Sequence, residues 1–185
     1  MGKVTISFVW AFIQKFGNTF LSFISNIILA RLLLPEDYGA IGMIMIFIVI
    51  SNTFIDGGFG SALIQKTNPT TKDYSTIFYW NIFFSIGLYI VLYFCAPFIA
   101  SFYKLPLLNN LLKVLGVVLI INSLSVVQST QLRKKLKFKE CAYATVISSL
   151  LAVCVTVFLA YNGMGVWSLV IQQILVSVFS FLLYL

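Results

Sequence analysis

The feature that most constrains this chain is a succession of six long apolar stretches separated by short polar turns. A helix needs about 20 apolar residues, each rising about 1.5 Å, to cross about 30 Å of hydrocarbon, and every stretch reaches that length. The sequence therefore predicts an all-α, polytopic transmembrane helix bundle of about six spans, with residues 1–185 as a single transmembrane domain. We place the spans at residues 8–34, 38–64, 74–102, 107–128, 141–161 and 165–185.

Composition excludes most other classes of protein. Hydrophobic residues make up 61% of the chain and charged residues 9%, whereas soluble domains carry about 25% charged residues. There is no histidine and there are five carboxylates, so general bases and metal ligands are scarce. No Gly-rich loop ends in Gly-Lys-Ser/Thr, which disfavours ATP use. We therefore expect neither an enzyme nor a metal or cofactor site.

Lysine and arginine divide unequally between the two sides of the predicted bundle. If consecutive spans alternate in direction, the side that holds the N-terminus carries most of them, and the positive-inside rule places that side in the cytoplasm. The other side holds Arg31, Lys104 and Lys113. The basic residues on the N-terminal side are Lys3, Lys66, Lys72, Arg133, Lys134, Lys135, Lys137 and Lys139.

The most basic segment, residues 133–139, is interpreted first as a determinant of topology. An anionic leaflet attracts each nearby Lys or Arg by about 1 kcal/mol, so membrane lipids are the expected neighbours of this segment. A specific contact with lipid phosphate is the functional alternative. Nucleic acid is not an expected partner, because no recognition fold accompanies the basic residues.

The first span carries a polar stripe: Lys15, Asn18, Ser22, Ser25 and Asn26 recur at helical spacing and share one face. A lysine at depth costs about 2.5–3.5 kcal/mol on insertion scales, so such a stripe normally faces protein or a water-filled cavity. One hypothesis is a cavity wall in which Lys15 meets an anionic substrate group. The alternative is that Lys15 snorkels to the headgroups while the amides hold neighbouring helices together.

Asp56 is the carboxylate placed well inside a span, and Gly57, Gly58 and Gly60 follow it. These glycines weaken or break the helix. Two interpretations stay open for Asp56. It pairs with a substrate cation, a coupling proton or Lys15, or it caps the helix fragment after the glycines near the cytoplasmic interface.

The C-terminal residues 181–185 are apolar, with no basic residue to hold that end in the cytoplasm. We therefore expect a truncated chain. A natural six-span protein with an apolar tail is the alternative.

Several sequence words resemble the N-terminal part of bacterial oligosaccharide flippases and polysaccharide export proteins. These proteins belong to the multidrug, oligosaccharidyl-lipid and polysaccharide exporter superfamily. The resemblance covers almost the whole chain, and its words occur in the order typical of that family. They are ARLLLPEDYG at residues 30–39, DGGFGSALIQK at 56–66, DYSTIFYWN at 73–81, VQ at 127–128 and LRKKLKFK at 132–139.

The resemblance implies a transporter of two six-helix lobes around a cavity that opens alternately to each side, with this chain as the N-terminal lobe. Such proteins move undecaprenyl-diphosphate-linked oligosaccharide across the bacterial inner membrane for O-antigen, capsule or exopolysaccharide synthesis. The polysaccharide polymerase machinery is a further implied partner. Basic cavity residues are thought to meet the diphosphate, which points to Lys15 and Arg31. The predicted substrate-cavity residues are Lys15, Asn18, Ser22, Asn26, Arg31 and Asp56.

Three other functions compete with a flippase. An ion-coupled multidrug antiporter of the same superfamily would need cation-pairing carboxylates in several spans, where this chain offers Asp56. A non-transporting membrane scaffold would tolerate apolar replacement of Lys15, Asn18 and Asp56. An intramembrane enzyme lacks a convincing pair of nucleophile and base.

Overall fold

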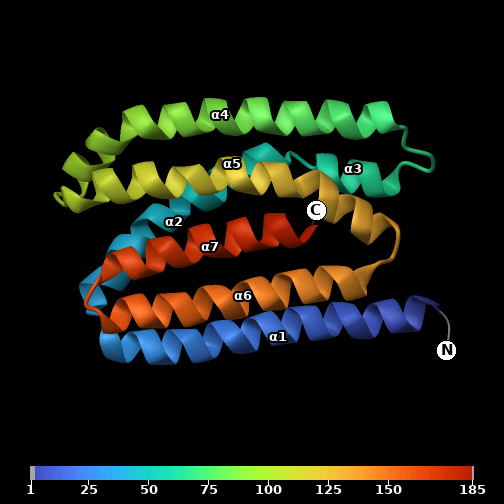
Figure 1. Ribbon diagram of the computed structural model, residues 1–185. Helices are drawn as coiled ribbons and strands as arrows, with labels where there is room; N and C mark the ends of the chain where they lie inside the picture. The colour runs from blue at the N-terminus through green and yellow to red at the C-terminus, as the bar shows by residue number, and fades with distance from the viewer. Residues whose placement is uncertain (1–2, 185) are drawn as a thin grey trace.

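The computed structural model describes the backbone of residues 3–184 and the side chains of residues 8–184. It confirms the predicted all-α class, and its helices run side by side along one elongated bundle (Figure 1). The helices are α1 (Lys3–Leu32), α2 (Pro35–Asp56), α3 (Phe59–Gln65), α4 (Thr71–Phe102), α5 (Leu107–Lys134), α6 (Phe138–Tyr161) and α7 (Val166–Tyr184).

Five helical segments of the described chain are long and apolar enough to cross a membrane: Pro35–Gln65, Thr71–Phe102, Leu107–Lys134, Phe138–Tyr161 and Val166–Tyr184. Helix α1 has 30 residues and lies along the spanning helix α6, in the position of a sixth span (Figure 1). The polar stripe lowers the mean hydropathy of α1, so α1 is not one of these five segments. The predicted multi-pass membrane architecture is confirmed, while the crossing of the membrane by α1 stays a prediction.

Several helix bounds differ from the predicted spans, and two of the differences have a clear physical reason. Helix α4 begins at Thr71 rather than residue 74 because Thr70 and Asp73 form a capping box. The Thr70 backbone N–H donates to Asp73 Oδ2 at 2.7 Å. Helix α5 continues beyond Gln128 to Lys134, since polar residues at the end of a span extend the helix as it leaves the apolar layer.

The predicted second span is two helices rather than one. Gly57 (φ +45°) and Gly58 (φ +79°) are both left-handed, a conformation that costs glycine little, and the Gly57 N–H ends α2 by donating to Thr53 O at 3.1 Å. Asp56 is therefore the last residue of α2, directly before the break.

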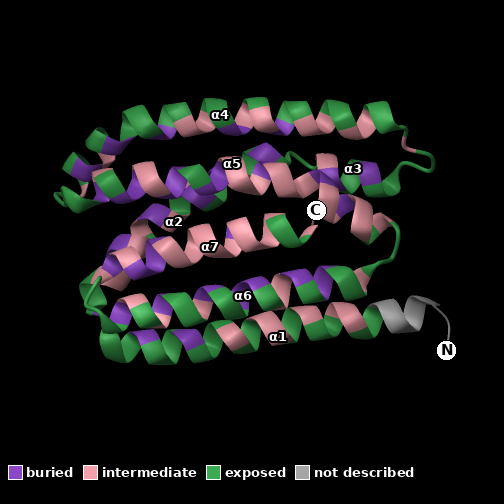
Figure 2. Cartoon of the chain, viewed as in Figure 1, coloured by how far each residue is buried: buried purple, intermediate pink, exposed green. Residues whose placement is uncertain are grey.

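Helix α5 is the centre of the bundle. It contacts α2, α3, α4, α6 and α7, and buried residues recur along it (Figure 2). The fully buried leucines at its start join residues of α2, α4 and α7 in the main apolar cluster. These leucines are Leu108, Leu111, Leu112, Leu115 and Leu119.

Close packing and hydrogen bonds join the remaining helices. Ser85 Oγ of α4 donates to Ser123 Oγ of α5 at 3.0 Å. Helix α6 packs between α1 and α7, and its buried positions hold small side chains that let the backbones approach, as is typical of helix contacts in lipid. These positions are Cys141, Ala142, Ala144, Ser148, Ser149, Ala152, Thr156 and Ala160.

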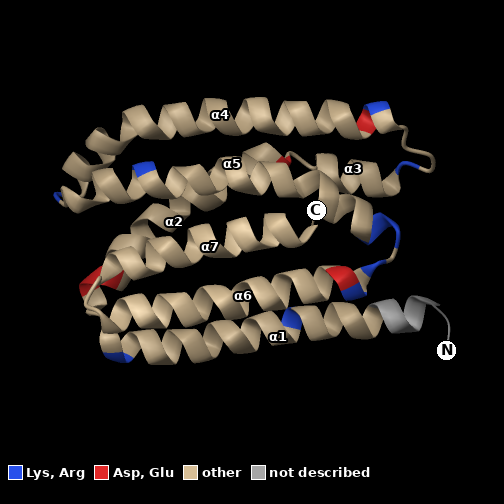
Figure 3. Cartoon of the chain, viewed as in Figure 1, with Lys and Arg blue, Asp and Glu red and all other residues tan. Residues whose placement is uncertain are grey.

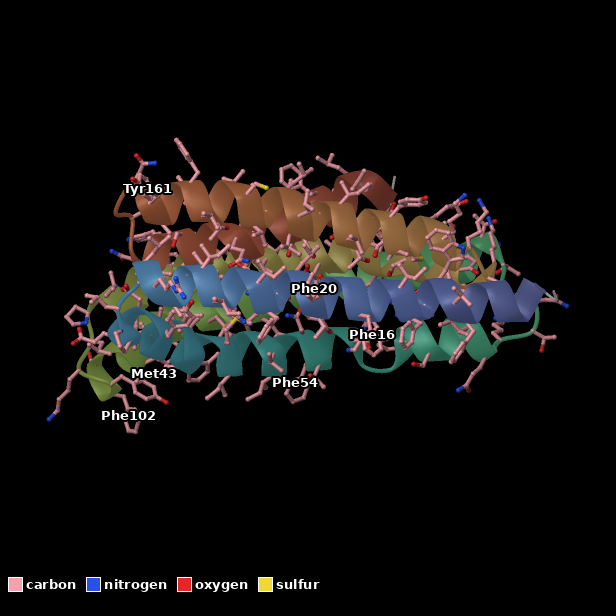
Figure 4. All side chains as sticks on the ribbon, turned by 90° about the horizontal axis from the view of Figure 1, so that it is seen from below. Phe16, Phe20, Met43, Phe54, Phe102 and Tyr161 are labelled. Carbon is pink, nitrogen blue, oxygen red and sulfur yellow. The ribbon has the colours of Figure 1, made fainter. Side chains whose placement is uncertain are left out.

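Most charged residues lie toward the two ends of the bundle (Figure 3). We call the end with the α3–α4 and α5–α6 connections, residues 66–70 and 135–137, the basic end. There Lys134 Nζ donates to the carbonyls of Leu63 (2.7 Å), Ile64 (3.2 Å) and Lys66, and so ties α5 to the end of α3. Exposed aromatic side chains such as Phe102 and Tyr161 mark the opposite end (Figure 4), as at a membrane interface.

The α4–α5 contact supplies a stability prediction. A Cβ built on Gly116 would lie 2.7 Å from Cδ2 of the Tyr89 ring, whereas one built on Gly87 of α4 meets nothing within 4 Å. We expect Gly116→Ala to lower the free energy of unfolding by about 1–3 kcal/mol through overpacking. Gly87→Ala, the matched control, should not lower it and should raise it by up to about 1 kcal/mol, the difference in helix propensity between Gly and Ala. Unfolding of the purified protein in detergent measures both, and equal values would contradict the packing described.

Candidate functional site

The polar stripe of α1 lines a groove made of two adjoining cavities that share Asn18. The first, about 330 Å³, lies toward the basic end. The second, about 290 Å³, lies between α1, α6 and α7. We call the two together the α1 groove. The first cavity is lined by Ala11, Gln14, Lys15, Asn18, Thr19, Arg133 and Thr145, and the second by Asn18, Ser22, Asn26, Ser149, Val153, Gln172, Gln173 and Val176.

Part of the stripe holds helices together. Gln14 Nε2 donates to Thr145 Oγ1 at 2.9 Å, and Ser149 Oγ donates to Asn18 Oδ1. Gln172 Nε2 of α7 donates to the buried Ser25 Oγ at 3.2 Å. Interhelical bonds of this kind stabilise helix contacts in lipid by about 0.6 kcal/mol each. The stripe thus agrees in part with the alternative that its polar groups join neighbouring helices.

The rest of the stripe faces the groove. Lys15, Ser22 and Asn26 are exposed and line it, and no hydrogen bond or ion pair of their side chains occurs within the described residues. They are therefore available to a ligand. Together with Asn18, these three residues make up four of the six predicted cavity residues, and all four lie along the same side of α1.

The first cavity is cationic. Lys15 of α1 and Arg133 of α5 both line it, and no carboxylate does. Within the described residues, the ion pairs are Lys66–Asp73 and Lys137–Glu140, so neither cation of the cavity is neutralised by an acidic partner. An ammonium and a guanidinium on one cavity suit a phosphate-type anion, since both form charge-assisted hydrogen bonds with its oxygens.

The second cavity is polar and uncharged. Asn18, Asn26, Gln172 and Gln173 contribute amides and Ser22 and Ser149 contribute hydroxyls, so donors and acceptors alternate along it. Such a surface suits a hydroxyl-rich neutral group, which itself donates and accepts hydrogen bonds.

The other two predicted cavity residues, Arg31 and Asp56, lie outside the α1 groove. Arg31 is in the last turn of α1, about 24 Å along the helix from Lys15. Asp56 is beside α3 and α5: a Cβ built on Gly60 would lie 3.3 Å from its Oδ1 and 3.5 Å from Thr130 Oγ1. It forms no ion pair with Lys15, and no side chain caps α3. A role for either residue in substrate binding stays a prediction.

Sequence reasoning missed several groove residues. The sequence does carry a signal for Gln172 and Gln173. Two amides inside an apolar span cost free energy of insertion unless they have a structural or functional role. From the sequence, Arg133 belongs to the basic segment 133–139. In the structure it also lines the first cavity of the groove together with Lys15. The remaining polar additions are Gln14, Thr19, Thr145 and Ser149.

The described residues contain no group of three or more His, Cys, Asp or Glu side chains that would hold a metal ion. The polar groups that line the groove are two cations, amides and hydroxyls.

The fold and groove define a multi-pass α-helical membrane protein with a partly cationic polar path along its first helix. The chain belongs to the polysaccharide biosynthesis protein family, whose pattern matches residues 28–185. The resemblance inferred from the sequence is thus confirmed for the family. The match begins at residue 28, so most of α1 lies outside it. No solved structure matches the chain.

Relatives include two transport or biosynthesis proteins and one membrane protein of a cps region. The chain is 26% identical over 169 residues to the succinoglycan biosynthesis transport protein ExoT of Rhizobium meliloti, covering 91% of this chain and 34% of ExoT. It is 28% identical over 136 residues to the teichuronic acid biosynthesis protein TuaB of Bacillus subtilis, covering 74% and 28%.

An uncharacterized membrane protein in the cps region of Klebsiella pneumoniae is 26% identical over 157 residues, covering 85% of this chain and 32% of that protein. The chain thus spans about a third of the length of these relatives.

The groove predicts water access at one side of α1. In a background whose cysteines Cys95, Cys141 and Cys154 are replaced, Ser22→Cys should react with a hydrophilic maleimide in membranes, because thiol reaction needs the water-exposed thiolate. Phe20→Cys is the control, since Phe20 is exposed but does not line the groove. We expect its labelling to be roughly tenfold slower. Equal labelling rates would contradict a groove that is wet on one side of α1.

Proposed function

We propose that this chain is one lobe of a flippase for undecaprenyl-diphosphate-linked oligosaccharide in surface polysaccharide synthesis. The observation that carries the proposal is that Lys15 and Arg133 line the same cavity and that no carboxylate lines it. That cavity continues into one lined by amides and hydroxyls. Membership of the polysaccharide biosynthesis family supports a cargo from that pathway.

Desolvation explains why such a cargo needs a polar path. Polar groups moved from water into hydrocarbon without hydrogen-bond partners cost several kcal/mol each, and ionised groups cost far more. A sugar-diphosphate headgroup therefore does not cross the apolar layer unaided. A groove of cations, amides and hydroxyls replaces the lost water.

The two cavities divide the headgroup between them. Lys15 and Arg133 meet the diphosphate oxygens, and the amides of Asn26, Gln172 and Gln173 meet sugar hydroxyls. The lipid tail stays in the bilayer.

Transport requires a further part of the protein, in keeping with the length of the relatives. A second lobe closes the groove, and rocking of the two lobes exposes it to each side in turn. The N-terminus and the basic end lie on the cytoplasmic side of the bacterial inner membrane, because the positive-inside rule places the more basic side of a membrane protein there. Delivery to the polysaccharide polymerase machinery follows.

Replacement of the two groove cations tests the proposal. In the intact protein, Lys15→Ala and Arg133→Ala should each lower surface-polysaccharide output roughly tenfold or more. A hydrogen bond to a charged group contributes about 1.5–3 kcal/mol, and 1.4 kcal/mol is a factor of ten. Lys15→Arg should retain most of the output. Output is measured in cells at matched membrane abundance of each variant.

The control is Lys113→Ala, which removes one charge from α5 at a site where Lys113 Nζ lies 4.6 Å from the Tyr93 ring centroid, outside the groove. Its output should be unchanged. Normal output from both groove variants would rule out the diphosphate contact and favour a non-transporting scaffold.

A further inference from the structure

A third cavity lies at the basic end, between α4 and α5. Its volume is about 450 Å³, larger than either part of the α1 groove, and it shares no lining residue with the groove. Thr71, Tyr74, Ser75 and Tyr79 line it from α4, and Gln131 and Lys135 line it from the end of α5 and beyond. We call it the α4–α5 pocket.

Lys135 is the free cation of this pocket. Its neighbours are committed elsewhere: Lys134 Nζ binds carbonyls at the end of α3, and Lys66 Nζ binds Asp73 Oδ2 at 2.7 Å. No hydrogen bond or ion pair of the Lys135 side chain occurs within the described residues, and no carboxylate lines the pocket. Asp73, the acidic residue of the first turn of α4, is already bound to Lys66 and Thr70. The pocket therefore presents an unneutralised positive charge.

The other lining groups are those of a membrane interface. Tyr74, Phe78 and Tyr79 provide aromatic surface within about 12 Å of the start of α4, and Tyr79 is 70% exposed. Thr71 and Ser75 add hydroxyl donors on the same part of the helix. Aromatic rings with polar tips are enriched at the headgroup level, where an apolar body and a wet end are both accommodated.

An apolar track leads from the pocket along α4. Phe83, Ile86 and Ile90 follow Tyr79 at helical spacing, and all three are exposed at the surface of the chain. A ligand with a charged head in the pocket and an apolar chain on this track would match both surfaces. A free phosphate ion would use only the first of them.

We propose that the α4–α5 pocket binds the headgroup of an anionic phospholipid. Lys135 meets the phosphate, Thr71 and Ser75 donate hydrogen bonds to headgroup oxygens, and an acyl chain lies along Phe83, Ile86 and Ile90. This lipid stays bound while cargo uses the α1 groove, so the site is independent of the proposed transport function.

Native mass spectrometry of the intact protein in detergent, titrated with phosphatidylglycerol or phosphatidylcholine, tests the proposal. Phosphatidylglycerol should bind in preference to phosphatidylcholine. Lys135→Gln should weaken the binding of phosphatidylglycerol about fivefold, the effect of one lysine near an anionic lipid. The charge-matched control is Lys139→Gln at the same end. Lys139 Nζ lies 5.8 Å from the ring centroids of Trp10 and Tyr143, outside the pocket, and its loss should change binding less than twofold.

A second variant separates the pocket from the general charge of the basic end. Ser75→Trp fills the cavity without changing charge and should also weaken binding of phosphatidylglycerol several-fold. Equal losses for Lys135→Gln and Lys139→Gln, or no loss for Lys135→Gln, would overturn the proposal in favour of diffuse attraction. A loss with Lys135→Gln and none with Ser75→Trp would place the lipid on the connecting segment and overturn the pocket. Because Lys135 and Ser75 are exposed, circular dichroism and monodispersity suffice to verify folding.

Discussion

The contact between α1 and α6 is the interaction on which the polar groove depends. In lipid, apolar side chains gain little by leaving the bilayer for a neighbouring helix, so helices join through close packing and interhelical hydrogen bonds. Helix α6 provides both: small side chains on its buried face, and the hydroxyls of Thr145 and Ser149, which bond to Gln14 and Asn18 of α1. The same bonds that hold α1 fix the direction in which its remaining polar groups face.

The polar stripe therefore has two roles, and Asn18, which bonds to Ser149 and also lines both cavities, takes part in each. Ser25 is buried and bound to Gln172, while Lys15 and Ser22 stay exposed and line the groove. If α1 carried only the hydrogen-bonded residues, its polar stripe would have a structural role alone. If it carried only the free ones, no hydrogen bond from the stripe would hold it to α6 and α7. The positive charge of the groove is confined to its first cavity. Lys15 and Arg133, from helices distant in sequence, both line that cavity and raise the electrostatic potential there.

Local signals in the sequence were sufficient for most of the architecture. Apolar length predicted the spans, the glycines after Asp56 predicted a weak point that proves to be a full break, and helical spacing placed Lys15, Asn18, Ser22 and Asn26 on one side of α1. The place of Arg133 in the groove was not predictable, because it depends on where the end of α5 lies relative to α1 in the folded bundle. Arg31 was predicted because the resemblance implies basic cavity residues, and Asp56 because it is a carboxylate inside a span; neither reason carries information on the distance to Lys15.

The pairing of α1 with α6 also sets an order of events during synthesis. The bonded partners Gln14 and Thr145, like Asn18 and Ser149, are 131 residues apart in the chain. At about 5–20 residues per second, α1 waits roughly 7–26 seconds for its partner helix to leave the ribosome. Throughout that interval an unpaired lysine and several amides must be accommodated at the edge of the bilayer or within the insertion machinery. Helix α1 is thus made before the other helices of this bundle but must wait for α6, its main neighbour.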